Sequence, residues 1–193
     1  MNFIFDIGNV LISYNPRLFL YGLFSDKSLA ESVGTTIFLS PEWRQLDQGL
    51  LTHEEATAIF CAREPAFREA IEKVMHNVFG LFTPISDTVA LLPEVKKAGH
   101  SLYYLSNISH EVRDHLLSEY QFFGMFDGGV FSCDIHVLKP SAAIYRQLLE
   151  DYSLSPADCL FFDDVEENVM AARKEGINGI VFTGAECVLP FLD

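Results

Sequence analysis

The chain is poor in positive charge. Its 193 residues include 13 Lys and Arg against 27 Asp and Glu, which gives a formal net charge of −14 at pH 7. A nucleic-acid-binding protein needs clustered cations to neutralise phosphates, so this balance argues against a nucleic-acid partner. A small phosphorylated ligand would instead need local positive charge, from a bound metal ion or from a few well-placed cations.

Long apolar runs and paired cysteines are also missing. No apolar stretch approaches the ~18 residues that a membrane span requires, and the N-terminus lacks the features of a signal peptide. The sequence has no C-x-x-C pair, and its cysteines are scattered: Cys61, Cys133, Cys159 and Cys187. These absences predict a cytoplasmic protein without a membrane partner, with buried thiols in a reducing compartment.

The first strand is predicted at the very start, and a lone acid follows it. Residues 2–5 have the apolar, aromatic pattern of a buried strand, Asp6 stands at its end, and Gly8 comes two residues later. In an open α/β sheet, ligands bind at the carboxyl ends of the strands. A buried carboxylate is costly unless it is compensated, so we interpret Asp6 as a nucleophile or a metal ligand.

The remaining chain divides into a helical and an alternating segment. Residues 14–84 show hardly any strand signal, and a capping-box spacing at Thr52 marks one of several expected helix starts. From Ser86 onward, helices alternate with short apolar strands, which predicts a doubly wound, Rossmann-like parallel sheet in an α/β fold. We therefore expect a core of residues 1–13 and 85–193, with residues 14–84 inserted as an α-helical cap.

The individual elements of the alternating segment follow from the same patterns. A helix is predicted over residues 89–98, ending at Gly99, and further helices over 109–117, 142–150 and 166–174. The expected strands cover residues 101–105, 129–132, 159–162 and 179–182.

Polar side chains follow several of these strands. Ser106 and Asn107 come after one strand, Asp163 and Asp164 after another, and Lys139 lies in a loop between sheet elements. Because parallel strands end at one edge of the sheet, these side chains can converge with the acid that follows the first strand. Carboxylates bind a hard cation, lysine adds a compact charge, and serine and asparagine donate to phosphate oxygens. The set predicts a site for phosphate and Mg²⁺.

The order of these motifs resembles the haloacid dehalogenase-like hydrolase superfamily, which consists mostly of phosphatases with a helical cap after the first strand. Residues 5–11 resemble its first motif, residues 105–107 the second, Lys139-Pro140 the third and residues 162–168 the fourth. Within the superfamily, the Asp-x-Gly-Asn-Val run is most similar to a bacterial group of sugar-phosphate phosphatases of the glucose-1-phosphate type.

The resemblance implies a nucleophile and a metal site. Asp6 would attack phosphorus and form an aspartyl-phosphate. The resemblance assigns Mg²⁺ to Asp6, Asp164 and the backbone carbonyl of Gly8, with Asp163 as a further ligand or an outer acceptor.

The resemblance also implies residues that bind the substrate. Ser106 and Asn107 would hold the transferring phosphoryl group, and Lys139 would neutralise its developing charge. Asn168 would orient the acidic loop from one helical turn further on.

Residues 43–49, in the expected cap, face the catalytic site in the resembling group. They include Trp43, Arg44 and Asp47. Our hypothesis is that this segment, Trp43 above all, helps to select the substrate. The alternative is that Trp43 is buried in the core of the cap.

One departure from the family pattern affects the mechanism. Most phosphatases of the superfamily carry a second aspartate as general acid and base where this chain has Gly8. Such catalysis is typically worth ~10²–10⁴-fold. The enzyme is therefore slow, or a cap residue or a water molecule replaces the acid, or the leaving group needs little protonation, as in a sugar 1-phosphate.

The predicted function is a Mg²⁺-dependent phosphatase that acts on a small phosphorylated metabolite, with a sugar phosphate as the expected class and a monomer or homodimer as the expected state. One alternative is a 2-haloacid dehalogenase, which uses the same nucleophile without a metal. Asp163 and Asp164 argue against it, because paired acids would repel a carboxylate substrate. The other alternative, which Gly8 leaves open, is a weakly active or non-catalytic binding protein.

Overall fold

The computed structural model describes residues 1–192, and its centre is a five-stranded parallel sheet in the order β5-β4-β1-β6-β7. The strands are β1 (Asn2–Phe5), β4 (Ser101–Ser106), β5 (Gly128–Phe131), β6 (Cys159–Asp163) and β7 (Asn178–Val181). The first strand lies in the middle, parallel to β4 on one side and β6 on the other. The predicted α/β fold is confirmed, and the end of β1 lies between two neighbouring strand ends.

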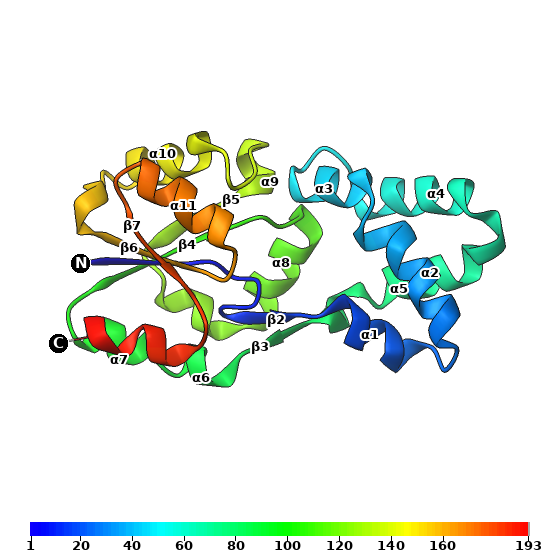
Figure 1. Cartoon of the computed structure of the whole chain (residues 1–193), viewed down its shortest axis with the longest axis horizontal. Helices are drawn as coiled ribbons and strands as arrows, with labels where there is room; N and C mark the ends of the chain where they lie inside the picture. The colour runs from blue at the N-terminus through cyan, green and yellow to red at the C-terminus, as the bar shows by residue number, and fades with distance from the viewer. Residues whose placement is uncertain (193) are drawn as a thin grey trace.

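Helices cover both faces of this sheet (Figure 1). Phe3 and Phe5 point into one core layer and Ile4 into the other, as the alternation of a strand requires. The layer around Ile4 packs against α10 (Ala142–Asp151) and α11 (Glu166–Lys174), and the opposite layer against α7 (Leu92–Lys97) and α8 (His110–Glu119). Both faces of β1 are therefore buried in the core. Any reactive side chain that the strand positions must lie at its end.

A group of helices lies at the other end of the molecule (Figure 1). These are α1 (Pro16–Leu23), α2 (Lys27–Phe38), α3 (Pro41–Asp47), α4 (His53–Arg63) and α5 (Arg68–His76). The chain enters and leaves them through β2 (Ile12–Tyr14) and β3 (Phe82–Pro84), which pair antiparallel. This small sheet was not predicted, because each strand has only three residues and its partner is distant in sequence. The division into core and cap stays a prediction.

Two other predictions differ from the structure. The helix expected over residues 89–98 is split into α6 (Ser86–Val89) and α7, because Pro93 lacks an N–H group and lies in the first turn of α7. The strand expected to include Ser132 ends at Phe131, and Ser132 begins the short helix α9 (Ser132–Ile135).

Short 3-10 turns complete the chain: Pro65–Phe67, Val78–Leu81, Gln121–Met125, Pro156–Asp158, Ala185–Cys187 and Leu189–Phe191. All four cysteines are free thiols. Within residues 1–192, no helix is both long enough and apolar enough to cross a bilayer.

Candidate active site

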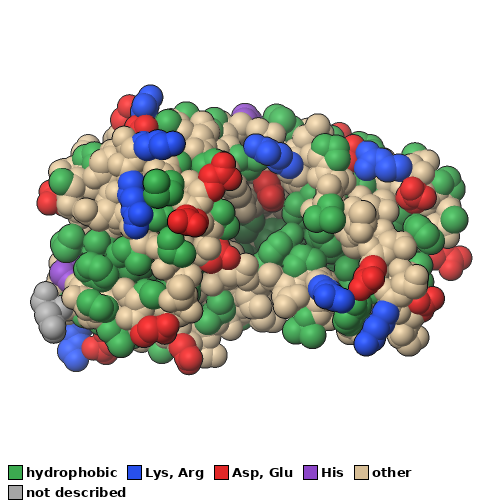
Figure 2. All heavy atoms as spheres, in the orientation of Figure 1, with side chains coloured by type: hydrophobic (Ala, Val, Ile, Leu, Met, Phe, Trp, Pro, Cys, Tyr) green, Lys and Arg blue, Asp and Glu red, His purple; other side chains and the backbone are tan. Residues whose placement is uncertain are grey.

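A cleft of about 280 Å³ opens where β1, β4 and β6 end, between the sheet and α3. The polar residues that line it include Asp6, Ser106, Lys139, Asp164 and Asn168. Figure 2 shows the hollow near the middle of the molecule, with hydrophobic atoms along its walls. Side chains that are far apart in the sequence are thus brought together at one edge of the sheet.

The loop after β1 holds Asp6 in a fixed position. The N–H of Ile7 donates to Oδ1 of Asp6 at 2.6 Å. Asn9 has a left-handed backbone (φ 53°), which asparagine tolerates better than most residues. Its Oδ1 accepts from the N–H of Tyr14 at 3.0 Å, and its Nδ2 donates to Oδ2 of Asp164 at 3.1 Å. Asn9, which sequence reasoning quoted in a motif but gave no role, therefore ties the first loop to the acidic loop.

Lys139 is the cation at the centre of the site. Its Nζ lies 2.7 Å from Oδ1 of Asp6 and 2.6 Å from Oδ2 of Asp163, and the residue is 4% exposed. Burial lowers the pKa of Lys139, but the two carboxylates outweigh burial and leave that pKa raised. Lys139 therefore stays charged and positions one oxygen of the predicted nucleophile.

Asp163 lies behind this cation and is completely buried. Its Oδ1 accepts from the N–H of Val165 at 2.8 Å, and Asn168 Nδ2 donates to both carboxylate oxygens at 3.1 and 3.0 Å. Both oxygens are thus engaged, and Asp163 does not line the cleft. These contacts suit the alternative in which Asp163 is an outer acceptor and not a direct metal ligand. The predicted role of Asn168, to orient the acidic loop, would use its two hydrogen bonds to Asp163.

The carboxylate oxygens of three aspartates lie close together, as they would around a bound cation. Asp6, Asp163 and Asp164 each offer an oxygen, and these oxygens lie within 4.8 Å of one another. Burial raises the pKa of Asp6, against the opposing charge of Lys139, and burial also raises the pKa of Asp164. Three carboxyl groups share one lysine, so their charge is not fully compensated by the protein. Such an oxygen set fits a hard divalent cation.

The two polar residues at the carboxyl end of β4, Ser106 within the strand and Asn107 after it, differ in their contacts. Ser106 is buried at the end of the strand and lines the cleft. Asn107 also lines the cleft, but its Oδ1 accepts from the N–H of Lys139 at 2.8 Å and its Nδ2 donates to the carbonyl of Lys139 at 3.1 Å. The side-chain amide of Asn107 therefore fixes the lysine loop, and Ser106 is the better placed of the two to meet a phosphoryl group.

Helix α3 and the β2–β3 pair supply the walls. Trp43, Tyr14 and Phe82 line the cleft, and Trp43 is 9% exposed and packs edge-on against Phe38. Trp43 is thus both part of the hydrophobic core and part of the cleft wall, and its role in selecting the substrate stays a prediction. Asp47 lines the cleft too, whereas Arg44 is exposed and does not.

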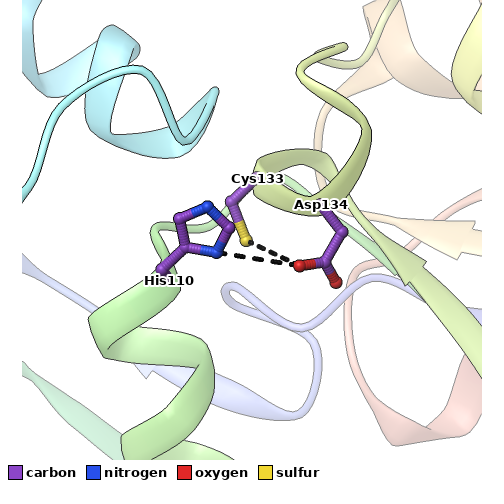
Figure 3. A group of neighbouring side chains, drawn as sticks. All are labelled: His110, Cys133 and Asp134. Atoms are coloured by element: carbon purple, nitrogen blue, oxygen red, sulfur yellow. Dashed lines mark hydrogen bonds and ion pairs between the residues drawn. The ribbon is translucent and has the colours of Figure 1, made fainter.

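A second cluster of possible metal ligands consists of His110, Cys133 and Asp134 (Figure 3). Asp134 is paired with the guanidinium of Arg113 through the oxygen that lies 3.7 Å from Nδ1 of His110. Burial raises the pKa of the Cys133 thiol to about 12, so it is protonated near neutral pH. A protonated thiol and a carboxylate already paired with arginine do not suit a metal ion.

Known proteins resemble this chain in sequence. A model of the haloacid dehalogenase-like hydrolase family matches residues 1–176. The sesquiterpene phosphatase astK of Aspergillus oryzae is 27% identical over 180 residues, which cover 93% of this chain and 88% of that protein.

Solved structures resemble it in fold. A haloacid dehalogenase family enzyme of Bacteroides thetaiotaomicron, BT-2542, has a TM-score of 0.71 at 20% identity, covering 98% of this chain and 97% of that one. The same enzyme in complex with magnesium and inorganic phosphate has a TM-score of 0.65 at 21% identity, with 93% and 92% covered. The L-2-haloacid dehalogenase of Xanthobacter autotrophicus, with chloropropionic acid covalently bound, has a TM-score of 0.68 at 16% identity, with 99% and 81% covered.

The narrower resemblance to sugar-phosphate phosphatases stays a prediction. The family model, in contrast, spans most of the sequence, and the four motifs meet at one cleft. The chain belongs to the haloacid dehalogenase-like hydrolase family.

Proposed function

We propose that this hydrolase is a Mg²⁺-dependent phosphatase that acts on a small phosphorylated metabolite through an aspartyl-phosphate on Asp6. The observation that carries the proposal is the buried Lys139 ammonium between Asp6 and Asp163, with Asp164 close by. The pair with Lys139 points one oxygen of Asp6 at the lysine, and its other oxygen is free to attack. A dehalogenase would use the same nucleophile without a metal, which leaves the additional acids without a role.

The residues of the cleft fit Mg²⁺. Asp6, Asp164 and the backbone carbonyl of Gly8 would hold it, with Asp163 as an outer acceptor. When bound, the ion supplies positive charge that screens the repulsion between a carboxylate and a phosphate. The magnesium and phosphate complex of the Bacteroides enzyme, which has the same fold, supports Mg²⁺ as the ion.

The protein's own groups then divide the chemistry. Asp6 attacks phosphorus, Ser106 donates to the transferring phosphoryl group, and Lys139 neutralises charge that develops on its oxygens. Helices α1–α5 act as a cap, and α3 contributes Trp43 to the wall that faces the substrate.

Two substrate classes have support. The Asp-x-Gly-Asn-Val motif favours a sugar phosphate, as the sequence predicts. The walls of the cleft favour an apolar ester, because they consist largely of Ile12, Tyr14, Trp43, Phe82, Ile108 and Val112. The similarity to a protein named as a sesquiterpene phosphatase agrees with this second class. A screen that pairs sugar phosphates with isoprenyl monophosphates of equal charge would separate the two.

Hydrolysis of p-nitrophenyl phosphate tests the reaction class. We expect turnover with Mg²⁺, loss of turnover with EDTA, and a loss of at least 10²-fold on Asp6→Asn, which removes the nucleophile. Turnover that survives Asp6→Asn would contradict the proposal. If no ester is hydrolysed, release of halide from 2-haloacids distinguishes a dehalogenase from a binding protein.

A further inference from the structure

Asp47 is a carboxyl group in the cleft that the reaction described above does not use. It is the last residue of α3, one helical turn after Trp43, so the two side chains share a face of the helix. Both line the cleft that also contains Asp6. Asp47 is half-buried and is one of the residues that line the cleft. Asp47 and the nucleophile therefore line the same cleft, Asp47 from α3 and Asp6 from the end of β1.

The end of α3 is fixed to α9, which directly follows β5, by three contacts. The hydroxyl of Ser132 donates to the backbone carbonyl of Asp47, and Nδ1 of His136 lies 2.7 Å from the carbonyl of Gln48. Gly49 packs so closely that a Cβ there would lie 2.4 Å from the carbonyl oxygen of Cys133. These contacts join α3 to α9, and they hold Asp47 at a set position relative to the strand ends.

The carboxyl group of Asp47 has no compensating partner within residues 1–192. No side-chain hydrogen bond or ion pair of Asp47 is formed there, and its electrostatic neighbours include the phenol of Tyr14 and the thiol of Cys133. Burial raises the pKa of Asp47 to about 7. A carboxyl group with such a pKa can both donate and accept a proton near neutral pH, as a general acid and base must.

The other titratable side chains in the cleft already have another role or partner. Asp6 is the nucleophile, Lys139 is paired with two carboxylates, and Asp164 accepts from Asn9 at the metal site. Burial and the nearby Asp47 raise the pKa of Tyr14, which makes its phenol a poor acid. Asp47 is the remaining titratable side chain of the cleft, and it has no hydrogen-bond or ion-pair partner within residues 1–192.

We propose that Asp47 is the general acid and base of this site, in place of the carboxyl group that Gly8 lacks. The assignment rests on the proposed phosphatase function. As the Asp6 oxygen bonds to phosphorus, the bond from phosphorus to the ester oxygen breaks, and that oxygen takes the proton of Asp47. The Asp47 carboxylate then accepts a proton from water while the water oxygen attacks phosphorus and releases Asp6. Inorganic phosphate leaves, and Asp47 is protonated again.

Leaving-group dependence tests this assignment. Nitrophenolate leaves without a proton, whereas the alkoxide of an alkyl phosphate needs one. We expect Asp47→Asn to lower kcat/KM for glycerol phosphate by about 10²-fold or more, and for p-nitrophenyl phosphate by less than about 10-fold. A series of aryl phosphates should show a steeper dependence on leaving-group acidity in the variant. Equal losses on all esters, or no loss on any, would overturn the role of Asp47.

A matched control separates this effect from a general disturbance of the helices. Glu54 is exposed at the start of α4, and Glu54→Gln makes the same chemical change away from the cleft. We expect it to leave both activities unchanged. If the wild type fails to hydrolyse p-nitrophenyl phosphate with Mg²⁺, the proposed function fails and the role of Asp47 with it. If the wild type is active and Asp47→Asn shows no preference between esters, only the role of Asp47 fails.

The pH profile gives a second readout. The donor form of Asp47 is lost as pH rises through about 7, so kcat/KM for the alkyl ester, which reports the free protein and the first step, should fall over that range. Titratable groups that face Asp47 or share its cleft are Tyr14, Cys133, Asp6, Lys139 and Asp164. The fall should be absent in Asp47→Asn, and for p-nitrophenyl phosphate in either protein. A fall that persists unchanged in Asp47→Asn would overturn the assignment.

Discussion

The position of Gly8 has room for the side chain that it lacks. A Cβ there would meet no atom within 4 Å, and its φ lies outside the left-handed region. If Asp47 supplies the missing proton, a carboxyl group at Gly8 should take over the task. We expect Gly8→Asp to raise kcat/KM for glycerol phosphate at least about 10-fold in the Asp47→Asn background, and to add much less to the wild type. If Gly8→Asp raised kcat/KM by the same factor in the Asp47→Asn background and in the wild type, the two carboxyl groups would be acting independently.

The positions of single residues could be predicted from the sequence where the order of the parallel strands alone determines them. Asp6 and Asp164 follow strands, Ser106 ends one, and parallel strands end together, so the convergence of these residues could be predicted. The engagement of the Asn107 amide with the backbone of Lys139 could not, because it depends on how two distant loops fold against each other. The orientation of Asp47 into the cleft likewise depends on how α3 docks on α9.

Gly49 lets the end of α3 pack closely against α9, and the position of Asp47 depends on this contact. Gly49 has φ +66°, and a Cβ would collide with the carbonyl of Cys133. We expect Gly49→Ala to destabilise the protein by roughly 1–3 kcal/mol through backbone strain. It should also lower kcat/KM for glycerol phosphate more than for p-nitrophenyl phosphate, because the collision displaces the end of α3. Thermal denaturation and the two assays measure these effects.

Gly99 provides the control for that prediction. It also has a left-handed backbone (φ +83°), but a Cβ there would meet no atom within 4 Å, and it lies at the end of α7, away from the cleft. Gly99→Ala should therefore lower the melting temperature while the ratio of the two activities stays that of the wild type. If Gly49→Ala also keeps the wild-type ratio, the position of Asp47 does not depend on this contact.

Helices with strong terminal signals were predictable, and elements defined by distant partners were not. The capping box is present as expected, since Thr52 Oγ1 accepts from the N–H of Glu55 and the Glu55 carboxylate accepts from the N–H of Thr52. The β2–β3 pair carried no such signal, because its short strands are stabilised by each other across the whole helical segment. A site wall that includes Tyr14 and Phe82 was therefore missed together with those strands.

The whole molecule sets an electrostatic problem that its active site has to solve. A net charge of −14 repels a phosphate ester, and Lys139, the cation of the cleft, is already shared by two carboxylates. The sequence predicted this conflict from composition alone, and the structure locates it, because the acids gather where β1 and β6 end. A divalent metal ion bound by these acids is the simplest way to offset the repulsion, since it adds positive charge where the substrate's phosphate must lie.

Metal binding should then stabilise the fold by mass action. We expect Mg²⁺ at 100 times its Kd to stabilise the native protein by about 2.7 kcal/mol, measured as a rise in melting temperature. Because so acidic a protein also responds to ionic strength, the reference is NaCl at matched ionic strength. Asp164→Asn should abolish most of the Mg²⁺-specific rise, whereas Asp134→Asn, in the cluster that does not suit a metal, should retain it. An equal rise in Asp164→Asn and the wild type would place the ion elsewhere and would remove the metal from the proposed cleft.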